Sequence, residues 1–314
     1  MEYISGRYEI LDNNDKIVCG KLYKARDLEN DALVYIQLLK DNKYISKSFL
    51  PNLIDESTML NEINSYNIAK ILDLGIHLSH EERYFYVVNE YFCGIELKKI
   101  IKGNYMDLNS IVTITKKILK TLDTGYRQGL YHGSLSEENI FVDENYNIKI
   151  YDLGITKANG GVNIRMNDNI SFLSPHQLNI NYTDIESDFF AIGVVMYYCL
   201  FKKMPFKIAK TEFDMLKNID KGINLDPEKI TIFNEPLIKI IKKLLNRKDK
   251  YNNYNEILID LTEIMYVKAD IVENKDIDLE EVYYEEPKKD NSFMVKLVSI
   301  IMCIIILIMI IMQL

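Results

Sequence analysis

The 314-residue sequence lacks a surplus of basic residues, because 46 Asp and Glu outnumber 38 Lys and Arg and leave a formal net charge of −8. A nucleic-acid-binding surface needs positive charge to offset phosphate repulsion, so we expect no nucleic-acid partner. Cysteine is also scarce, and its positions are far apart in the chain: Cys19, Cys93, Cys199 and Cys303. No pair has the spacing of a zinc site or a redox motif, so we expect reduced thiols in a cytosolic domain.

The most pronounced feature that is present is an apolar run, LVSIIMCIIILIMIIMQL, which carries no charge over residues 297–314. As a helix it would span about 27 Å at ~1.5 Å per residue, close to the ~30 Å hydrocarbon core of a bilayer. The sequence therefore predicts a C-terminal transmembrane anchor over residues 293–314. The alternative, a core helix, would need a whole domain to cover its apolar sides. Three lysines precede the run and favour a cytoplasmic N-terminal part: Lys288, Lys289 and Lys296.

Residues 271–292 are rich in acidic side chains and show little apolar periodicity, which indicates a flexible juxtamembrane linker. We expect partners for the preceding domain among cytosolic or membrane proteins, besides the membrane contact through the C-terminal helix. The sequence does not identify these partners, and the role of Tyr283 and Tyr284 in the linker stays open.

The remaining sequence is typical of a globular chain, with 48% hydrophobic and 27% charged residues overall. Short alternating runs predict strands near residues 7–15, 20–27, 32–39 and 84–92. Helical spacing predicts one early helix over 48–63 and, later, helices near 108–129, 186–201 and 235–247. A small β-rich part followed by a larger helical part predicts an α+β fold with a cleft between two lobes.

Several motifs in this order resemble those of the Hanks-type (bacterial Ser/Thr) protein kinase family over residues 5–268, with an N-lobe over about 5–92 and a C-lobe over about 93–268. In the first lobe VYIQ stands where the family has V-A-I-K, and VVNEYFCGIEL resembles the hinge between the lobes. In the second lobe the matching stretches are HGSLSEEN for H-R-D-x-K-x-x-N, KIYDLG for D-F-G, FLSPHQL for the A-P-E region, and SDFFAIGVVMYYCLFKKMPF for the helix that follows. The resemblance implies a two-lobed kinase fold.

The resemblance also implies that the groups which move phosphate are lost. Gln37 stands at the position of the lysine that neutralises the phosphates, so Glu56, which is retained, loses its lysine partner. Ser134 replaces the aspartate base, and a hydroxyl is no base near pH 7. Ser136 replaces a second cation, the lysine of the catalytic loop. A lysine of the glycine-rich loop, either Lys16 or Lys21, is a less favoured alternative source of the positive charge that is missing at Gln37.

The binding positions are only partly retained. The glycine-rich loop reads DKIVCG, with Asp15, Ile17 and Gly20 at the three glycine positions, which favours a plain hairpin turn over a phosphate clamp. The resemblance implies four positions that would contact ATP. Gly20 and Gln37 lie in the cleft, and Glu90 and Phe92 lie in the hinge. Both magnesium-ligand positions survive as Asn139 and Asp152, either for Mg²⁺ or as structural hydrogen-bonding groups.

The supporting framework implied by the resemblance is better preserved. Asp188 matches the residue that supports the catalytic loop, and a spine between the lobes matches Leu60, His132 and Leu153. A buried Glu–Arg ion pair of the family becomes His176 and Lys250, which cannot pair with each other as acid and base. We therefore expect a membrane-anchored pseudokinase that binds partners; the alternatives are a divergent active kinase that uses Mg-ATP and a nucleotide-switched sensor.

Overall fold

The structure is a computed structural model, and it describes residues 3–11, 18–79, 81–103, 106–165, 170–232 and 234–273. Residues 1–268 form one compact unit, and a second unit covers residues 269–314. The predicted anchor over 293–314 lies outside the described residues, as does the predicted linker beyond Glu273. None of the helices in the described ranges is long and apolar enough to cross a membrane.

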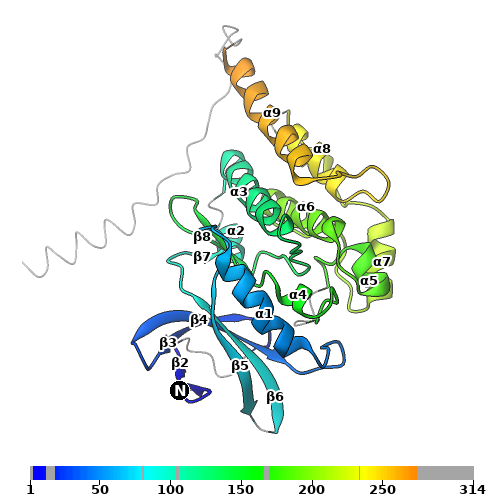
Figure 1. Ribbon diagram of the computed structural model, residues 1–314. Helices are drawn as coiled ribbons and strands as arrows, with labels where there is room; N and C mark the ends of the chain where they lie inside the picture. Colours follow the sequence, from blue (N-terminus) through cyan, green and yellow to red (C-terminus); the bar gives the residue numbers. More distant parts are fainter. Residues whose placement is uncertain are drawn as a thin grey trace, which may run out of the picture. The chain divides into compact units, whose positions relative to one another are not determined.

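The N-lobe is built on an antiparallel sheet of six strands in the order β1-β2-β3-β4-β6-β5 (Figure 1). The strands are β1 (Tyr3–Ile4), β2 (Tyr8–Ile10), β3 (Leu22–Asp27), β4 (Ala32–Lys40), β5 (Ile71–Ser79) and β6 (Glu82–Glu90). Helix α1 (Phe49–Glu62) packs against β5 through the apolar stripe that predicted it. Because β4 lies between β3 and β6, its residues from Val34 to Leu39 are all buried. The period of two places Tyr35, Gln37 and Leu39 on one face of β4.

The C-lobe is helical, and its elements are α2 (Leu97–Lys102), α3 (Leu108–Tyr126), α4 (Ile155–Ala158), α5 (Pro175–Ile180), α6 (Ile185–Phe201), α7 (Glu212–Asp220), the 3-10 turn η1 (Pro227–Lys229), α8 (Glu235–Leu244) and α9 (Tyr254–Glu273). Helix α6 is apolar on nearly every side and is buried between α3 and α8, as such a helix must be. Asp184 precedes the helix as its N-cap, and its carboxylate accepts the Ser187 N–H. Gly193 allows α8 to approach, since a Cβ there would lie 2.9 Å from the Leu244 Cβ.

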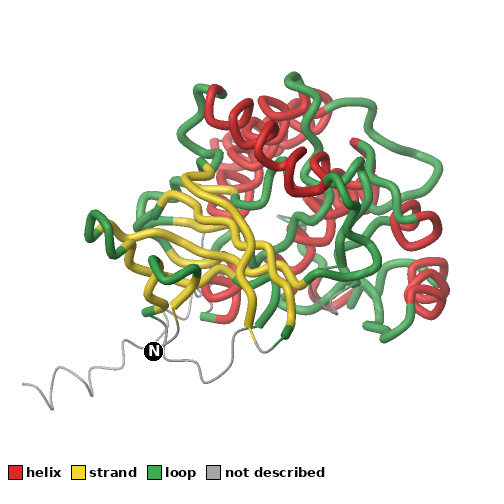
Figure 2. Tube along the Cα trace, turned by 60° about the horizontal axis from the view of Figure 1, so that its bottom comes forward, coloured by secondary structure: helices red, strands yellow, loops and turns green. Residues whose placement is uncertain are grey.

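A second, three-stranded sheet joins the two lobes, in the order β7 (Ile95–Glu96), β8 (Ile140–Val142) and β9 (Ile148–Ile150). The Ala69 N–H, which follows α1 in the N-lobe, donates to the Ile150 carbonyl at 2.9 Å. Figure 2 shows the strands gathered in one part of the molecule and most of the helices in the other. The predicted α+β arrangement of a β-rich N-lobe and a helical C-lobe is confirmed.

Candidate functional site

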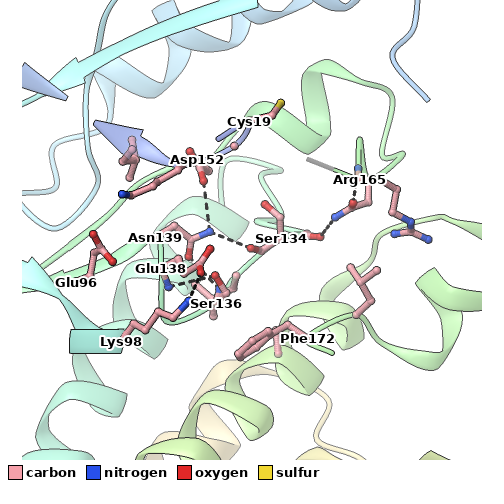
Figure 3. Close-up of a pocket in the computed structure, with 18 of the residues that line it drawn as sticks. Cys19, Glu96, Lys98, Ser134, Ser136, Glu138, Asn139, Asp152, Arg165 and Phe172 are labelled. Atoms are coloured by element: carbon pink, nitrogen blue, oxygen red, sulfur yellow. Dashed lines mark hydrogen bonds and ion pairs between the residues drawn. The ribbon is translucent and has the colours of Figure 1, made fainter. Parts of the chain in front are cut away.

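A cavity of about 620 Å³ lies next to the loop before β8 and the loop after β9. Residues of both lobes form its walls (Figure 3). Residues Val18–Leu22 close it from the N-lobe, while Gly133–Ser136 and Asn139 line it from the C-lobe. Asp152, which follows β9, also lines the cavity. The cavity thus brings together Gly20, Ser134, Ser136, Asn139 and Asp152, as the motif order predicts.

Asp188 holds the loop that carries these serines. Its carboxylate oxygens accept the backbone N–H groups of His132 and Gly133, each at 2.8 Å. His132, Gly133 and Asp188 are all buried, and burial raises the pKa of Asp188 to about 6. Burial likewise lowers the pKa of His132 to about 4, which keeps the imidazole neutral. The predicted support of the loop by Asp188 is confirmed.

Gln37 uses its amide to join the glycine loop to the centre of the site. Its Nε2 donates to the Gly20 carbonyl at 2.7 Å and lies 3.3 Å from Asp152 Oδ2. The side chain is fully buried, and no hydrogen-bond partner for its Oε1 is found among the described residues. A neutral amide therefore fills the position at which a kinase has an ammonium group, and it closes the loop onto β4 without supplying charge.

Asp152 is buried in a left-handed conformation with φ 69°. Besides the Gln37 amide, Asn139 Nδ2 lies 3.4 Å from Asp152 Oδ2. Burial raises the pKa of Asp152 to about 6, although both amide donors oppose the shift. Within the part of the chain that the structure describes, Asp152 Oδ1 is buried and has no hydrogen-bond partner.

Among the described residues of this site, that buried carboxylate oxygen is a ligand of the type that a magnesium ion takes. The amide oxygen of Asn139 already accepts the Ser136 N–H at 3.0 Å, and its amide nitrogen faces Asp152. Across the described ranges no three acidic, histidine or cysteine side chains gather as a metal-binding group. Mg²⁺ normally takes one or two carboxylates together with phosphate oxygens, so this chain offers only a partial ligand set and we assign no reaction step to the metal.

Replacing Asp152 by asparagine should stabilise the domain at pH 8, by about 3 kcal/mol, because burial raises the pKa of Asp152 from 3.8 to about 6 and each pKa unit corresponds to ~1.36 kcal/mol. The folded protein holds the Asp152 proton more tightly than the unfolded chain, so the stability contributed by this group is full below about pH 4. It is lost as the pH rises through the folded pKa of about 6. Urea unfolding at several pH values should therefore show a flatter profile for Asp152→Asn. Equal profiles for both proteins would contradict the assignment.

Ser134 and Ser136 are both held by the loop itself. The Ser134 carbonyl accepts Asn139 Nδ2 at 2.9 Å, and its Oγ lies 3.4 Å from His132 Nδ1. The Ser136 Oγ accepts the Glu138 N–H at 3.3 Å. Neither side chain is a carboxylate base or a cation.

Glu56 does have an ion-pair partner, which corrects the expectation that it lost one along with the lysine of β4. The Lys157 Nζ lies 3.2 Å from Glu56 Oε2, within ion-pair range although not aligned as a hydrogen bond. Helices α1 and α4 pack together at this point. Glu56 is thereby tied to the segment after D-L-G instead of to the cleft. Of the two substitute lysines, Lys21 lines the cavity with its Nζ over the Tyr23 ring, and Lys16 lies outside the described residues, as do Asp15 and Ile17.

The two hinge positions, Glu90 and Phe92, do not line the cavity. The Glu90 carboxylate pairs with the buried Lys149 on β9 at 3.0 Å. The Glu90 backbone carbonyl accepts the Tyr151 hydroxyl at 3.2 Å. Lys149 also lies over the Tyr66 ring, 4.4 Å from its centroid. Sequence reasoning missed Lys149 and Tyr151, although the tyrosine directly before D-L-G in KIYDLG is a visible signal.

The two residues that replace the family's buried ion pair each have a separate acidic partner. His176 Nδ1 lies 2.9 Å from Asp184 Oδ2, and the Lys250 ammonium pairs with Glu186. Both acids lie at the start of α6, so the start of this helix now interacts with two segments. The expected repacking of this region therefore consists of two exposed or half-exposed pairs in place of one buried pair.

A sequence model of the protein kinase domain family matches residues 18–252 of this chain. A probable serine/threonine-protein kinase of Clostridium acetobutylicum is 27% identical over 278 residues, which cover 85% of this chain and 41% of that protein. The probable serine/threonine-protein kinase PknB of Lactococcus lactis is 26% identical, over 81% of this chain and 41% of that protein. The serine/threonine-protein kinase PrkC of Bacillus subtilis is 28% identical, over 65% and 32%. The chain thus spans about two fifths or less of the length of these relatives.

Proposed function

Because the chain belongs to the protein kinase domain family, we propose that it is a pseudokinase, a kinase-fold domain that binds protein partners without transferring phosphate. Its place would be the cytoplasmic face of a membrane, with residues 293–314 as the anchor. The partners would be cytosolic or membrane proteins that contact the domain, since the net charge of −8 disfavours nucleic acid.

The observation that carries this proposal is that neutral side chains stand at the three positions where a kinase has a charged group. Phosphoryl transfer depends on positioned charge, supplied by cations around the phosphates and by a carboxylate that accepts the substrate proton. Gln37, Ser134 and Ser136 stand at those three positions. The Gln37 Nε2 donates to the Gly20 carbonyl, the Ser136 Oγ accepts the Glu138 N–H, and the Ser134 Oγ lies 3.4 Å from His132 Nδ1. A positioned base alone contributes roughly 10²–10⁴-fold to a rate.

A divergent active kinase is the second candidate, and the names of the relatives favour it, since they are called serine/threonine-protein kinases. In that case Asp152 would hold Mg-ATP with a cation not yet assigned. Lys21 is the basic residue of the glycine loop that lines the cavity. A nucleotide-switched sensor is a third reading, for which nucleotide binding without transfer is the requirement.

The test is transfer by the full chain, purified in detergent and incubated with γ-labelled ATP and Mg²⁺ or Mn²⁺. We expect no label on the chain or on a general protein substrate beyond that seen with Asp152→Ala, because Gln37, Ser136 and Ser134 replace the family's two lysines and its aspartate base. The Asp152→Ala protein controls for contaminating kinases. Label that depends on Asp152 would reject the pseudokinase proposal in favour of the active kinase.

A further inference from the structure

Aromatic side chains gather where the hinge meets the small sheet. Tyr35 comes from β4, Phe141 from β8, and Tyr151 follows β9 directly. We call these three residues the aromatic cluster. They are almost completely buried and belong to one group of packed side chains, whose other buried members are Leu22, Ala69 and Phe92.

The rings of the aromatic cluster contact one another directly. The centroid of Tyr35 lies 4.9 Å from that of Phe141 and 5.5 Å from that of Tyr151, and Phe141 and Tyr151 are 5.0 Å apart. Such distances are those of packed aromatic pairs. A flat base between Tyr35 and Phe141 would need about 7 Å, because each of its faces requires a carbon–carbon separation of ~3.5–4.0 Å.

The backbone carbonyl of Glu90 in the hinge also has a hydrogen-bond partner in this cluster. The Tyr151 hydroxyl donates to the Glu90 carbonyl at 3.2 Å, so this acceptor already has a partner from within the chain. Burial raises the pKa of Tyr151 well above its usual range, which keeps the hydroxyl protonated as a donor. The Glu90 side chain is engaged as well, because its Oε1 pairs with the Lys149 Nζ on β9 at 3.0 Å.

The cavity stops where the aromatic cluster begins. Its lining includes Leu22 and Asp152, which border the cluster in sequence or in packing, but it includes neither Glu90 nor any ring of the cluster. The open space of about 620 Å³ therefore lies on the side of the glycine loop and the catalytic loop, and neither Glu90 nor Phe92 lines it. The three rings pack with Phe92, and the Tyr151 hydroxyl bonds to Glu90, so these rings and not open space adjoin the two hinge residues.

We propose that Tyr35, Phe141 and Tyr151 occupy the place of the nucleotide base, so that this chain binds no adenine nucleotide through its hinge. The proposal deepens the pseudokinase proposal, on which it rests for the identification of the hinge. It also excludes the nucleotide-switched sensor, because a base that cannot enter cannot shift the lobes. Tyr35 is the residue that stands at the alanine of V-A-I-K, so Tyr35→Ala is the direct change that opens the site.

The experiment measures binding of adenosine and of Mg-ATP to the full chain by calorimetry, with thermal unfolding as a second readout. For the unaltered chain we expect no heat and no shift of Tm with adenosine. Tyr35→Ala should melt at a lower temperature because it leaves a cavity, and adenosine should raise its Tm again by filling that cavity. The dissociation constant of Tyr35→Ala for adenosine should be at least about tenfold lower than the lower limit measured for the dissociation constant of the unaltered chain.

Tyr151→Phe is the matched control, since it keeps the ring and removes only the hydroxyl bond to Glu90. We expect it to exclude adenosine as the unaltered chain does. Tyr151→Ala is the second opening variant if Tyr35→Ala does not fold. Binding of Mg-ATP without adenosine binding would support the proposal, as contact through phosphates in the open cavity.

Two results would overturn the proposal. One is adenosine binding by the unaltered chain, and the other is a folded Tyr35→Ala or Tyr151→Ala protein that still excludes adenosine. Neither result decides the proposed function, because a chain that binds nucleotide can still fail to transfer phosphate. The labelling experiment with Asp152→Ala addresses that separately.

Discussion

Replacing Gly133 by arginine, the residue that the kinase pattern H-R-D has at this position, should destabilise the domain by about 2–5 kcal/mol. Gly133 adopts φ 72°, a left-handed conformation that costs other residues roughly 1–2 kcal/mol. A Cβ there would lie 2.7 Å from Thr156 Cγ2 and 2.8 Å from Thr183 Cγ2, and such crowding typically costs ~1–3 kcal/mol. The loop of this chain therefore leaves no space for a side chain at Gly133 unless Thr156 or Thr183 moves. Urea unfolding followed by circular dichroism measures the loss.

Gly129 offers a matched control for this prediction. It has nearly the same conformation, φ 73°, but a Cβ there would meet only the Lys157 Nζ, at 4.0 Å. Gly129→Ala should therefore show the conformational cost alone, whereas Gly133→Ala should add the cost of crowding against Thr156. Equal losses of stability in the two alanine variants would show that the space around Gly133 is not limiting.

The lobes and the order of the site could be predicted because local patterns specify them. VYIQ, HGSLSEEN and KIYDLG place Gln37, Ser134 and Asp152 in the same cleft once the two-lobed arrangement is assumed. The apolar spacing of residues 48–63 predicts α1, and the structure has that helix at Phe49–Glu62. The Asp188 support could be predicted because SDFFAIGVVMYYCLFKKMPF resembles a helix of the family with Asp188 at the matching position; the composition of α6 alone does not single it out, since Glu186 is acidic too.

Contacts between distant segments were not predictable in this way. Lys157 is one of many lysines, and only the packing of α4 against α1 brings it to Glu56. The aromatic cluster depends on three strands that meet at the junction of the lobes, so no local pattern shows that Tyr35 and Tyr151 come together. Periodicity indicates which face is buried, but not which buried side chains contact each other across a gap of more than a hundred residues.

Replacing Asp188 by alanine should cost about 3–5 kcal/mol of stability, an effect as large as any expected here. The carboxylate accepts two buried backbone N–H groups, from His132 and Gly133, at 2.8 Å each. Without it both donors are left unsatisfied, and each such group costs roughly 1–3 kcal/mol. Thermal unfolding of the full chain measures the loss, and we expect Tm to fall by about 10 °C, at ~2–4 °C per kcal/mol for a domain of this size.

The pH dependence of that loss separates the carboxylate from a general packing defect. Burial raises the folded pKa of Asp188 to about 6, so the folded protein binds its proton more tightly than the unfolded chain does. The contribution of Asp188 is then full below about pH 4 and declines as the pH rises through 6. The difference in stability between the unaltered chain and Asp188→Ala should therefore be larger at pH 5 than at pH 8. Asp188→Asn, which retains one acceptor oxygen for the two N–H groups, should lose less than the alanine variant. A difference that does not change with pH, or an asparagine variant as unstable as the alanine variant, would mean that Asp188 acts only by filling space in α6.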